Sequence, residues 1–293
     1  MEWLVTAAAS GRTVRDVARN ELLLSYSALQ GAKWEDRILV NGLPVRVSAV
    51  LREGDLLTIE EAKKPPAYLP SPYQLPLHIP YRDQYLLVVD KSAPLAVQCS
   101  ARQPHNTLEN ALYSCMGCPD DFVFRPVNRL DKGTSGLMLV ALDAHTQQLM
   151  QRQLHSPDFQ RQYLAVTEGC PSPAEGTIDL PIAKADGATV RREVSPDGKK
   201  SITHYRTLEQ HGSLALLSLC LETGRTHQIR VHLSAMGCPV CGDFLYGTER
   251  EDLAGRFALH SAELCFRHPY TGSMIHLSSP LPEQLSSVLR CGC

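Results

Sequence analysis

The pattern of apolar and polar positions changes its period within the first sixty residues. Apolar residues recur at helical spacing over residues 13–24, and a second short helical stretch is predicted over residues 27–34. The apolar run Ile38–Val40 then enters an Asn-Gly turn, which is typical of a β-hairpin, and another strand is predicted at Leu56–Ile59. We therefore expect a compact module of two helices followed by a small β unit over residues 1–62.

The next segment has a different composition. Residues 63–77 contain Pro65, Pro66, Pro70, Pro72 and Pro76. Proline interrupts helices and central strands and favours an extended chain, so this segment is predicted to be a linker. It divides the N-terminal module from a larger domain at residues 78–293.

Strands and helices mix in the larger domain without a regular βαβ alternation. Apolar runs predict buried strands over residues 86–89, 137–142 and 163–167, and a helix capped by Asp143 is predicted to end at Leu154.

A strand with alternating leucines is predicted over residues 214–223. The helix after it is expected to be capped by Thr226 and closed by Gly237. The pattern indicates an α+β fold with a mixed or antiparallel sheet.

Composition narrows the possible partners and surroundings. The formal charge of -2 and a pI near 6.6 mean that any nucleic-acid partner needs a local basic patch. No apolar run is long enough to span a membrane, and the N-terminus lacks an export signal, so we expect a cytoplasmic protein, most simply a monomer.

Ten cysteines in such a chain indicate reduced thiols rather than disulfides. The pairs Cys115–Cys118 and Cys238–Cys241 raise the question of zinc, but small buried thiols explain them more simply, and no metal site is predicted.

Residues 128–136, Asn-Arg-Leu-Asp-Lys-Gly-Thr-Ser-Gly, concentrate charged and hydroxyl groups directly before the predicted strand 137–142. Such a loop can hold Asp131 beside positive charge, as a catalytic carboxylate requires. The same residues are also ordinary turn formers, so the loop alone leaves both readings open.

Arg225 is the second candidate, at the junction between the predicted strand and helix. A guanidinium there can grip a carboxylate in a fork, and if that carboxylate is Asp131, the pair would keep it ionised and oriented. The alternatives are a structural ion pair or an arginine that holds RNA phosphate.

These two segments together resemble motifs of the RluA-type RNA pseudouridine synthases. Residues 128–136 are similar to their Arg-Leu-Asp-x-x-Thr-Ser-Gly segment, and residues 223–232 to their second arginine motif. Further stretches that match in the same order are residues 79–91, 161–165, 242–247 and 259–262. The resemblance covers roughly residues 78–285 and implies the pseudouridine synthase fold with a central cleft. Residues 1–62 look like an S4-type RNA-binding domain, although their acidic residues offset their basic ones.

The match has two departures. Asn128 stands where the family usually has His, and Ser92-Ala93-Pro94 follows Lys91 in place of Pro-Ala-Gly. Neither replaces a group expected to be catalytic.

The resemblance implies an isomerase that converts uridine in RNA to pseudouridine. The N1–C1′ bond must break and C5 must rejoin C1′ without redox change, so no cofactor is expected. Asp131 would be the catalytic carboxylate, Arg225 its partner, and Tyr163 would stack on the uracil, with its hydroxyl assisting proton removal at C5.

Three further cations are expected to contact phosphates or to play structural roles: Arg129, Lys132 and Arg230. The S4-like module favours ribosomal RNA as substrate, with tRNA as the alternative. A non-catalytic RNA-binding or chaperone protein on the same fold is the competing function.

Overall fold

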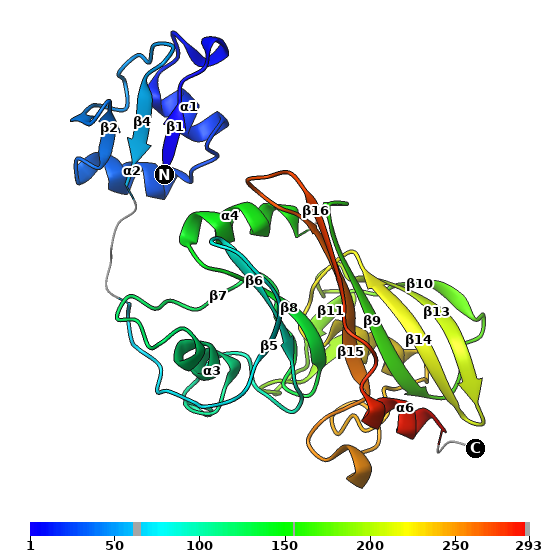
Figure 1. Cartoon of the computed structure of the whole chain (residues 1–293). Helices are drawn as coiled ribbons and strands as arrows, with labels where there is room; N and C mark the ends of the chain where they lie inside the picture. Colours follow the sequence, from blue (N-terminus) through cyan, green and yellow to red (C-terminus); the bar gives the residue numbers. More distant parts are fainter. Residues whose placement is uncertain (61–65, 155, 291–293) are drawn as a thin grey trace. The chain divides into compact units, whose positions relative to one another are not determined.

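The computed structural model describes residues 1–60, 66–154 and 156–290. The chain forms two compact units, Met1–Leu69 and Pro70–Cys293 (Figure 1). The boundary lies inside the segment predicted as a linker.

The first unit combines a small antiparallel sheet with two helices. The strand order is β1 (Glu2–Leu4), β4 (Leu56–Ile59), β2 (Ile38–Val40) and β3 (Leu43–Pro44). A 3-10 turn at Ala7–Ala9 precedes helices α1 (Val14–Asn20) and α2 (Tyr26–Trp34). The predicted order of two helices and a β unit is confirmed, while β1 is too short to show a period in the sequence.

The second unit contains a mixed sheet with ten strands. Its main order is β10 (Glu175–Asp179), β13 (Ile202–His211), β14 (Leu214–Leu221), β9 (Phe159–Glu168), β15 (Leu259–Arg267), β8 (Ser135–Ala141), β6 (Leu86–Lys91) and β5 (His78–Arg82). Strand β16 (Met274–Ser278) pairs with β15, and β7 (Arg125–Pro126) pairs with β8. The pair β8–β15 is parallel and the other pairs of this sheet are antiparallel, so the predicted α+β class is confirmed.

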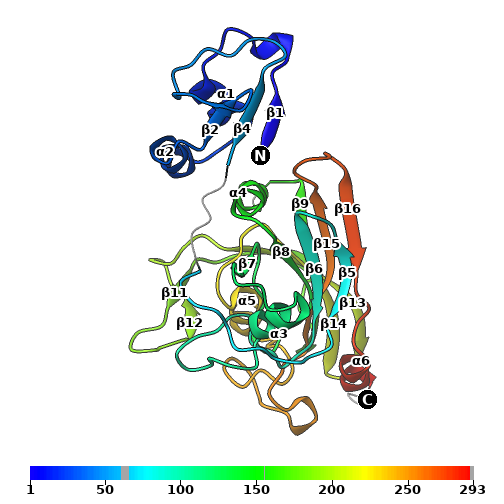
Figure 2. The same ribbon diagram turned by 60° about the vertical axis from the view of Figure 1, so that its left-hand side comes forward.

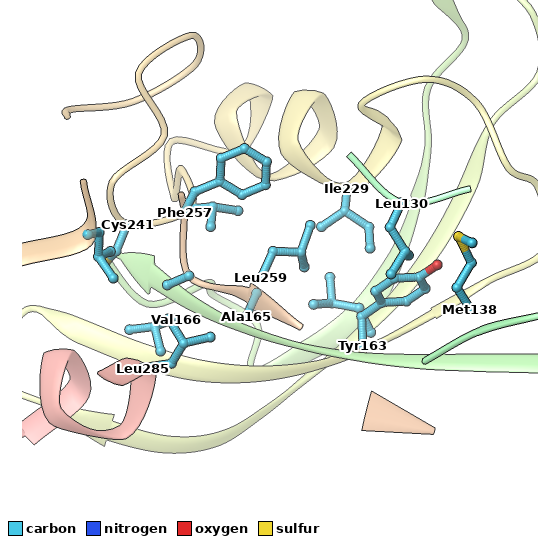
Figure 3. Packing of buried hydrophobic residues seen from close by; sticks show 14 of the residues in the cluster. Leu130, Met138, Tyr163, Ala165, Val166, Ile229, Cys241, Phe257, Leu259 and Leu285 are labelled. Atoms are coloured by element: carbon cyan, nitrogen blue, oxygen red, sulfur yellow. The ribbon is translucent and has the colours of Figure 1, made fainter. Parts of the chain in front are cut away.

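Helices and a small hairpin complete the unit. The helices are α3 (Leu108–Cys115), α4 (Ala144–Gln153), α5 (Gln228–Ala235) and α6 (Glu283–Arg290), with a 3-10 turn at Glu251–Leu253. The hairpin is formed by β11 (Ile182–Lys184) and β12 (Arg192–Val194). Figure 2 shows α3, α5 and this hairpin on the same side of the sheet. Figure 3 shows part of the core, in which Tyr163 of β9 lies close to Leu130.

The predicted strands at residues 86–89 and 137–142 are confirmed as neighbours. Strands β6 and β8 pair antiparallel, with Val88 opposite Leu139, and every residue of β8 is buried. A strand that is buried on both faces has a continuous run of apolar residues, and such runs are why β6 and β8 could be predicted from the sequence. Helix α4 is also as predicted, because the Asp143 side chain accepts a hydrogen bond from the Thr146 N–H.

The last part of the proline-rich segment does not behave as a spacer. Tyr73, Leu75 and Leu77 pack against the core of the second unit, and the Tyr73 N–H donates to Ser114 Oγ at 2.7 Å. The apolar residues between the prolines explain this anchoring. Residues 63–65 of the expected linker lie outside the described residues.

The expected cap of α5 is wrong. The helix begins after His227, which has a left-handed φ of 59°, and the exposed Thr226 does not cap it. Instead the Gln228 side chain folds back, and its Oε1 accepts from the Arg225 N–H at 3.0 Å and from the Thr223 hydroxyl at 2.8 Å. The glutamine side chain therefore orders the turn that a threonine cap would have ordered.

Gly136 allows the close approach of β8 and β15. It has a φ of +107°, and a Cβ built there would lie 2.2 Å from the Ser261 carbonyl oxygen. Because the obstacle is backbone of a buried neighbouring strand, a side chain can be placed only by moving the two strands apart. The second glycine of the motif at residues 128–136 is therefore required by the sheet.

We predict that Gly136→Ala lowers the free energy of unfolding by more than about 3 kcal/mol, the range of severe core mutations. The matched control is Gly237→Ala, which has a φ of +76° but nothing within 4 Å of its built Cβ. In the control the free energy of unfolding should fall by only roughly 1–2 kcal/mol, the cost of placing an alanine in a left-handed conformation. Urea denaturation measures both, and equal losses would show that the contact with Ser261 does not matter.

Candidate active site

The loop that carries Asp131 is held by hydrogen bonds from three directions. Buried Asn128 accepts the Leu139 N–H through Oδ1 at 2.9 Å, which ties the start of the loop to β8. Lys91 Nζ and the Leu95 N–H both donate to the Lys132 carbonyl oxygen, at 3.4 and 2.9 Å. These contacts hold the backbone on both sides of Asp131.

Asn128 thus acts as a backbone acceptor at the position where the sequence departs from the family pattern. Its Oδ1 accepts the Leu139 N–H, while Nδ2 is buried without a hydrogen-bond partner among the described residues. In this chain Asn128 therefore anchors the loop to β8.

Arg230 is the partner of Asp131. Its Nη1 donates to Asp131 Oδ2 at 3.0 Å, while Nε and Nη2 donate to the two oxygens of Asp243 at 2.7 and 2.8 Å. Arg230 is 3% exposed and Asp243 is fully buried. Burial opposes the charge of Arg230, but its hydrogen bonds to Asp243 and Asp131 outweigh burial, so the pKa of Arg230 lies above its ordinary value.

Aromatic rings enclose the Arg230 guanidinium. The carbon at its centre lies 4.0 Å from the Phe257 ring centroid and 5.0 Å from that of Tyr246. A Cβ at Gly133 would lie 2.6 Å from the Phe257 ring. The first glycine of the Asp131 loop therefore leaves the space in which this ring covers the arginine.

His227 lies at the same site. Its Nε2 is 3.9 Å from Asp131 Oδ2 and its Nδ1 is 2.8 Å from the Tyr246 hydroxyl. Burial lowers the pKa of His227, although the charge of Asp131 opposes the shift. Near neutral pH, Arg230 therefore supplies the positive charge beside Asp131.

The predicted pairing of Asp131 with Arg225 is wrong. Arg225 is exposed, and its Nε donates to the Lys200 carbonyl oxygen at 3.2 Å. It lies in the turn before α5, whereas Arg230 lies inside the helix and turns toward the sheet. Of the two roles expected for Arg230, phosphate contact or a structural role, its hydrogen bonds to Asp131 and Asp243 favour the structural one.

Tyr163 lies on β9 beside the same site, as expected. It is 5% exposed and lines the same cavity as Asp131. Burial raises the pKa of Tyr163, an effect that the charge of Arg161 partly offsets. The phenol is therefore protonated near neutral pH.

A cavity of about 780 Å³ joins these groups. Asp131, Tyr163 and His227 all line it, and it is of a size that takes a small ligand or a nucleotide. The charged side chains in its wall are Arg129, Asp131, Arg161, Arg225 and Arg230. Four arginines and one carboxylate make it locally basic in a chain with a formal charge of -2.

The other predicted cations occupy different places. Arg129 is exposed at the cavity, while Lys132 is exposed and is not part of the cavity wall. Lys91 was noticed in the sequence only as part of a motif, and it is 1% exposed with its ammonium donating to the carbonyls of Ser92, Leu95 and Lys132. Burial lowers the pKa of Lys91 to about 7, and the charge of Asp131 opposes this shift.

Asp243, His227 and Arg161 were missed as site residues. Asp243 lies in residues 242–247, which matched the family in the sequence, but that match indicated neither its burial nor the cation it binds. Among the described residues there is no group of three or more His, Cys, Asp or Glu side chains able to hold a metal. The eight described cysteines are all free, and within this part of the chain no helix is long and apolar enough to cross a membrane.

Comparison with known proteins assigns the chain to one family. Residues 85–235 match the family model described as RNA pseudouridylate synthase. The uncharacterized RNA pseudouridine synthase YjbO of Bacillus subtilis is 37% identical over 284 residues, which are 95% of this chain and 98% of that protein. Ribosomal large subunit pseudouridine synthase D of Xanthomonas campestris is 35% identical, over 98% of this chain and 90% of that protein.

A solved structure supports the same class. Human RNA Pseudouridylate Synthase Domain Containing 1 superimposes with a TM-score of 0.58 at 29% identity, covering 70% of this chain and 83% of that one. This chain belongs to the RluA-type RNA pseudouridine synthases, which are isomerases that convert uridine in RNA to pseudouridine. The resemblance found in the sequence is thereby confirmed for family, fold and reaction.

We predict that Arg230→Met lowers the free energy of unfolding by about 3–5 kcal/mol, because it leaves the buried Asp243 without its cation. Arg225→Met is the matched control and should change stability by less than about 0.5 kcal/mol, since Arg225 is exposed. The double variant Arg230→Met/Asp243→Leu should regain much of the lost stability without regaining activity. Denaturant melts test this, and equal losses for Arg230→Met and Arg225→Met would contradict the assignment.

Proposed function

We propose that this enzyme isomerises specific uridines in structured ribosomal RNA, with Asp131 as the catalytic carboxylate. The observation that carries the proposal is a single carboxylate, fixed by the buried Arg230, in a cavity whose other charged groups are arginines. The relatives named as ribosomal large subunit synthases favour ribosomal RNA over tRNA.

One carboxylate is enough for this reaction. The N1–C1′ bond breaks, the uracil turns within the cavity, and C5 bonds to C1′ as C5 loses its proton. Glycoside hydrolysis would instead require a second carboxyl group and an admitted water. Arg230 orients the Asp131 oxygens, and the buried wall of Leu130, Tyr163 and Ile229 excludes water from the detached base.

Tyr163 supports the base in this proposal. Its ring lines the cavity close to Asp131 and offers a face on which the uracil stacks, while its hydroxyl assists proton removal at C5. The target nucleotide must leave its stack to enter, which costs a few kcal/mol and least in a loop or bulge.

The exposed arginines hold the RNA around the entrance. Arg129 and Arg225 line the cavity from its exposed side and have the charge and reach to bind phosphates, and the exposed Lys132 follows Asp131 in the same loop outside the cavity wall. Both arginines keep guanidinium nitrogens free of carboxylates among the described residues, which suits them to this role.

The N-terminal unit contributes RNA binding as an S4-like domain in this proposal. Arg15 and Lys33 are exposed on α1 and α2, and Trp34 is 77% exposed at the end of α2. Cations next to exposed aromatic rings suit single-stranded or looped RNA. We also propose that the enzyme acts as a monomer in the cytoplasm, where ribosomal RNA is found.

We predict that the wild type releases tritium from ribosomal RNA labelled with 5-tritiated uridine, because C5 must lose its hydrogen. Asp131→Asn should abolish release while RNA binding, measured by filter retention, stays within about threefold, since one neutralised carboxylate does not remove a phosphate contact. Asp121→Asn, a change at an exposed carboxylate, should leave release unaltered. Full release by Asp131→Asn, or none by the wild type from any ribosomal RNA fraction, would contradict the proposal.

A further inference from the structure

Arg161 is a buried cation in the cavity wall, and it forms no ion pair with a carboxylate of the described residues. It lies on β9 in the row Phe159, Arg161, Tyr163, whose members alternate with more exposed residues and are all buried. Successive residues of a strand point to opposite faces, so the guanidinium shares the face of β9 that presents Tyr163 to the cavity. It is 8% exposed.

The contacts of Arg161 leave most of its donors unused. The central carbon of its guanidinium lies 5.6 Å from the Phe159 ring centroid. Its Nε is buried without a partner, and among the described residues no carboxylate lies within 4.0 Å of it. Arg230, in the same cavity wall, meets two carboxylates.

This difference points to a ligand. A buried charge without a counter-charge is strongly unfavourable, whereas the same charge becomes favourable when an anion supplies hydrogen-bond acceptors in a fork. The substrate of the proposed reaction is a polyanion whose phosphates lie next to every nucleotide, including the one that enters the cavity.

Gly224 leaves the guanidinium open to such an anion. A Cβ built on Gly224 would lie 3.3 Å from Arg161 Nη1 and 3.7 Å from Nη2. Gly224 is exposed and also lines the cavity, so an approach over this glycine reaches both terminal nitrogens from the solvent side. A larger side chain at this position would cover them.

We propose that Arg161 binds a backbone phosphate of the target strand, next to the uridine in the cavity. The proposal rests on the proposed function and adds the group that fixes the depth at which the nucleotide enters. Because Arg161 and Tyr163 share one face of β9, the bound phosphate lies on the same side of the strand as the tyrosine ring.

The test uses tritium release from the ribosomal RNA fraction on which the wild-type enzyme is active, at several KCl concentrations. Arg161→Gln should raise KM on the order of tenfold, with a smaller change in kcat, as expected for a charge-assisted fork. It should also reduce the slope of log KM against log salt by about 0.7, the contribution of one phosphate contact to a single strand. Arg161→Lys should restore the slope but only part of the affinity.

Two further variants separate access to Arg161 from its effect on folding. Gly224→Val keeps the cation but covers it, and should reproduce the rise in KM. Arg206→Gln, an exposed arginine of β13 outside the cavity, is the matched control and should leave KM and its salt slope unchanged.

The outcomes distinguish this inference from the proposed function. Absence of wild-type release contradicts the proposed function itself. An active wild type with unaltered KM and salt slope in both Arg161→Gln and Gly224→Val overturns the phosphate assignment. A raised KM with an unaltered slope also overturns it, because the group held would then be an uncharged oxygen.

Discussion

The buried ion pair between Arg230 and Asp243 is the constraint on which the site depends. Asp243 takes two donors of Arg230 in a fork, which leaves Nη1 aimed at Asp131. The rings of Phe257 and Tyr246 prevent the guanidinium from turning, and the Asp131 loop can approach because Gly133 has no side chain. One cation thus links a helix, a turn and a loop that are distant in the sequence.

This arrangement accounts for how a chain without overall positive charge can bind a polyanion. The formal charge of -2 is an average, while the charged wall of the cavity consists of four arginines and Asp131. Arg230 is occupied by carboxylates, so in the proposed account Arg129, Arg161 and Arg225 supply the charge that binds RNA. Association with RNA is therefore expected to depend on salt through these few contacts.

The sequence predicted most of the fold, and it placed Asp131, the carboxylate proposed to be catalytic, in the loop that lines the cavity. Buried strands such as β8 are predicted by their continuous apolar runs, and helices such as α4 by their helical spacing of apolar residues. Asp131 lies in a motif that resembles one of the family. The sequence could not show whether Arg225 or Arg230 pairs with Asp131. That pairing depends on the left-handed backbone at His227 and on the position of Asp243 in the fold. The sequence did not predict Arg161 as a site residue, because only the folded structure shows that it is buried and that no carboxylate among the described residues pairs with it.

The most direct test of the central claim is a map of pseudouridines in ribosomal RNA from cells that lack this gene, complemented with the wild type or with Asp131→Asn. If Asp131 is the catalytic carboxylate of a ribosomal RNA synthase, at least one pseudouridine disappears in the deletion, returns with the wild type and stays absent with Asp131→Asn. Its return with Asp131→Asn, or an unaltered ribosomal RNA map in the deletion, would contradict the account.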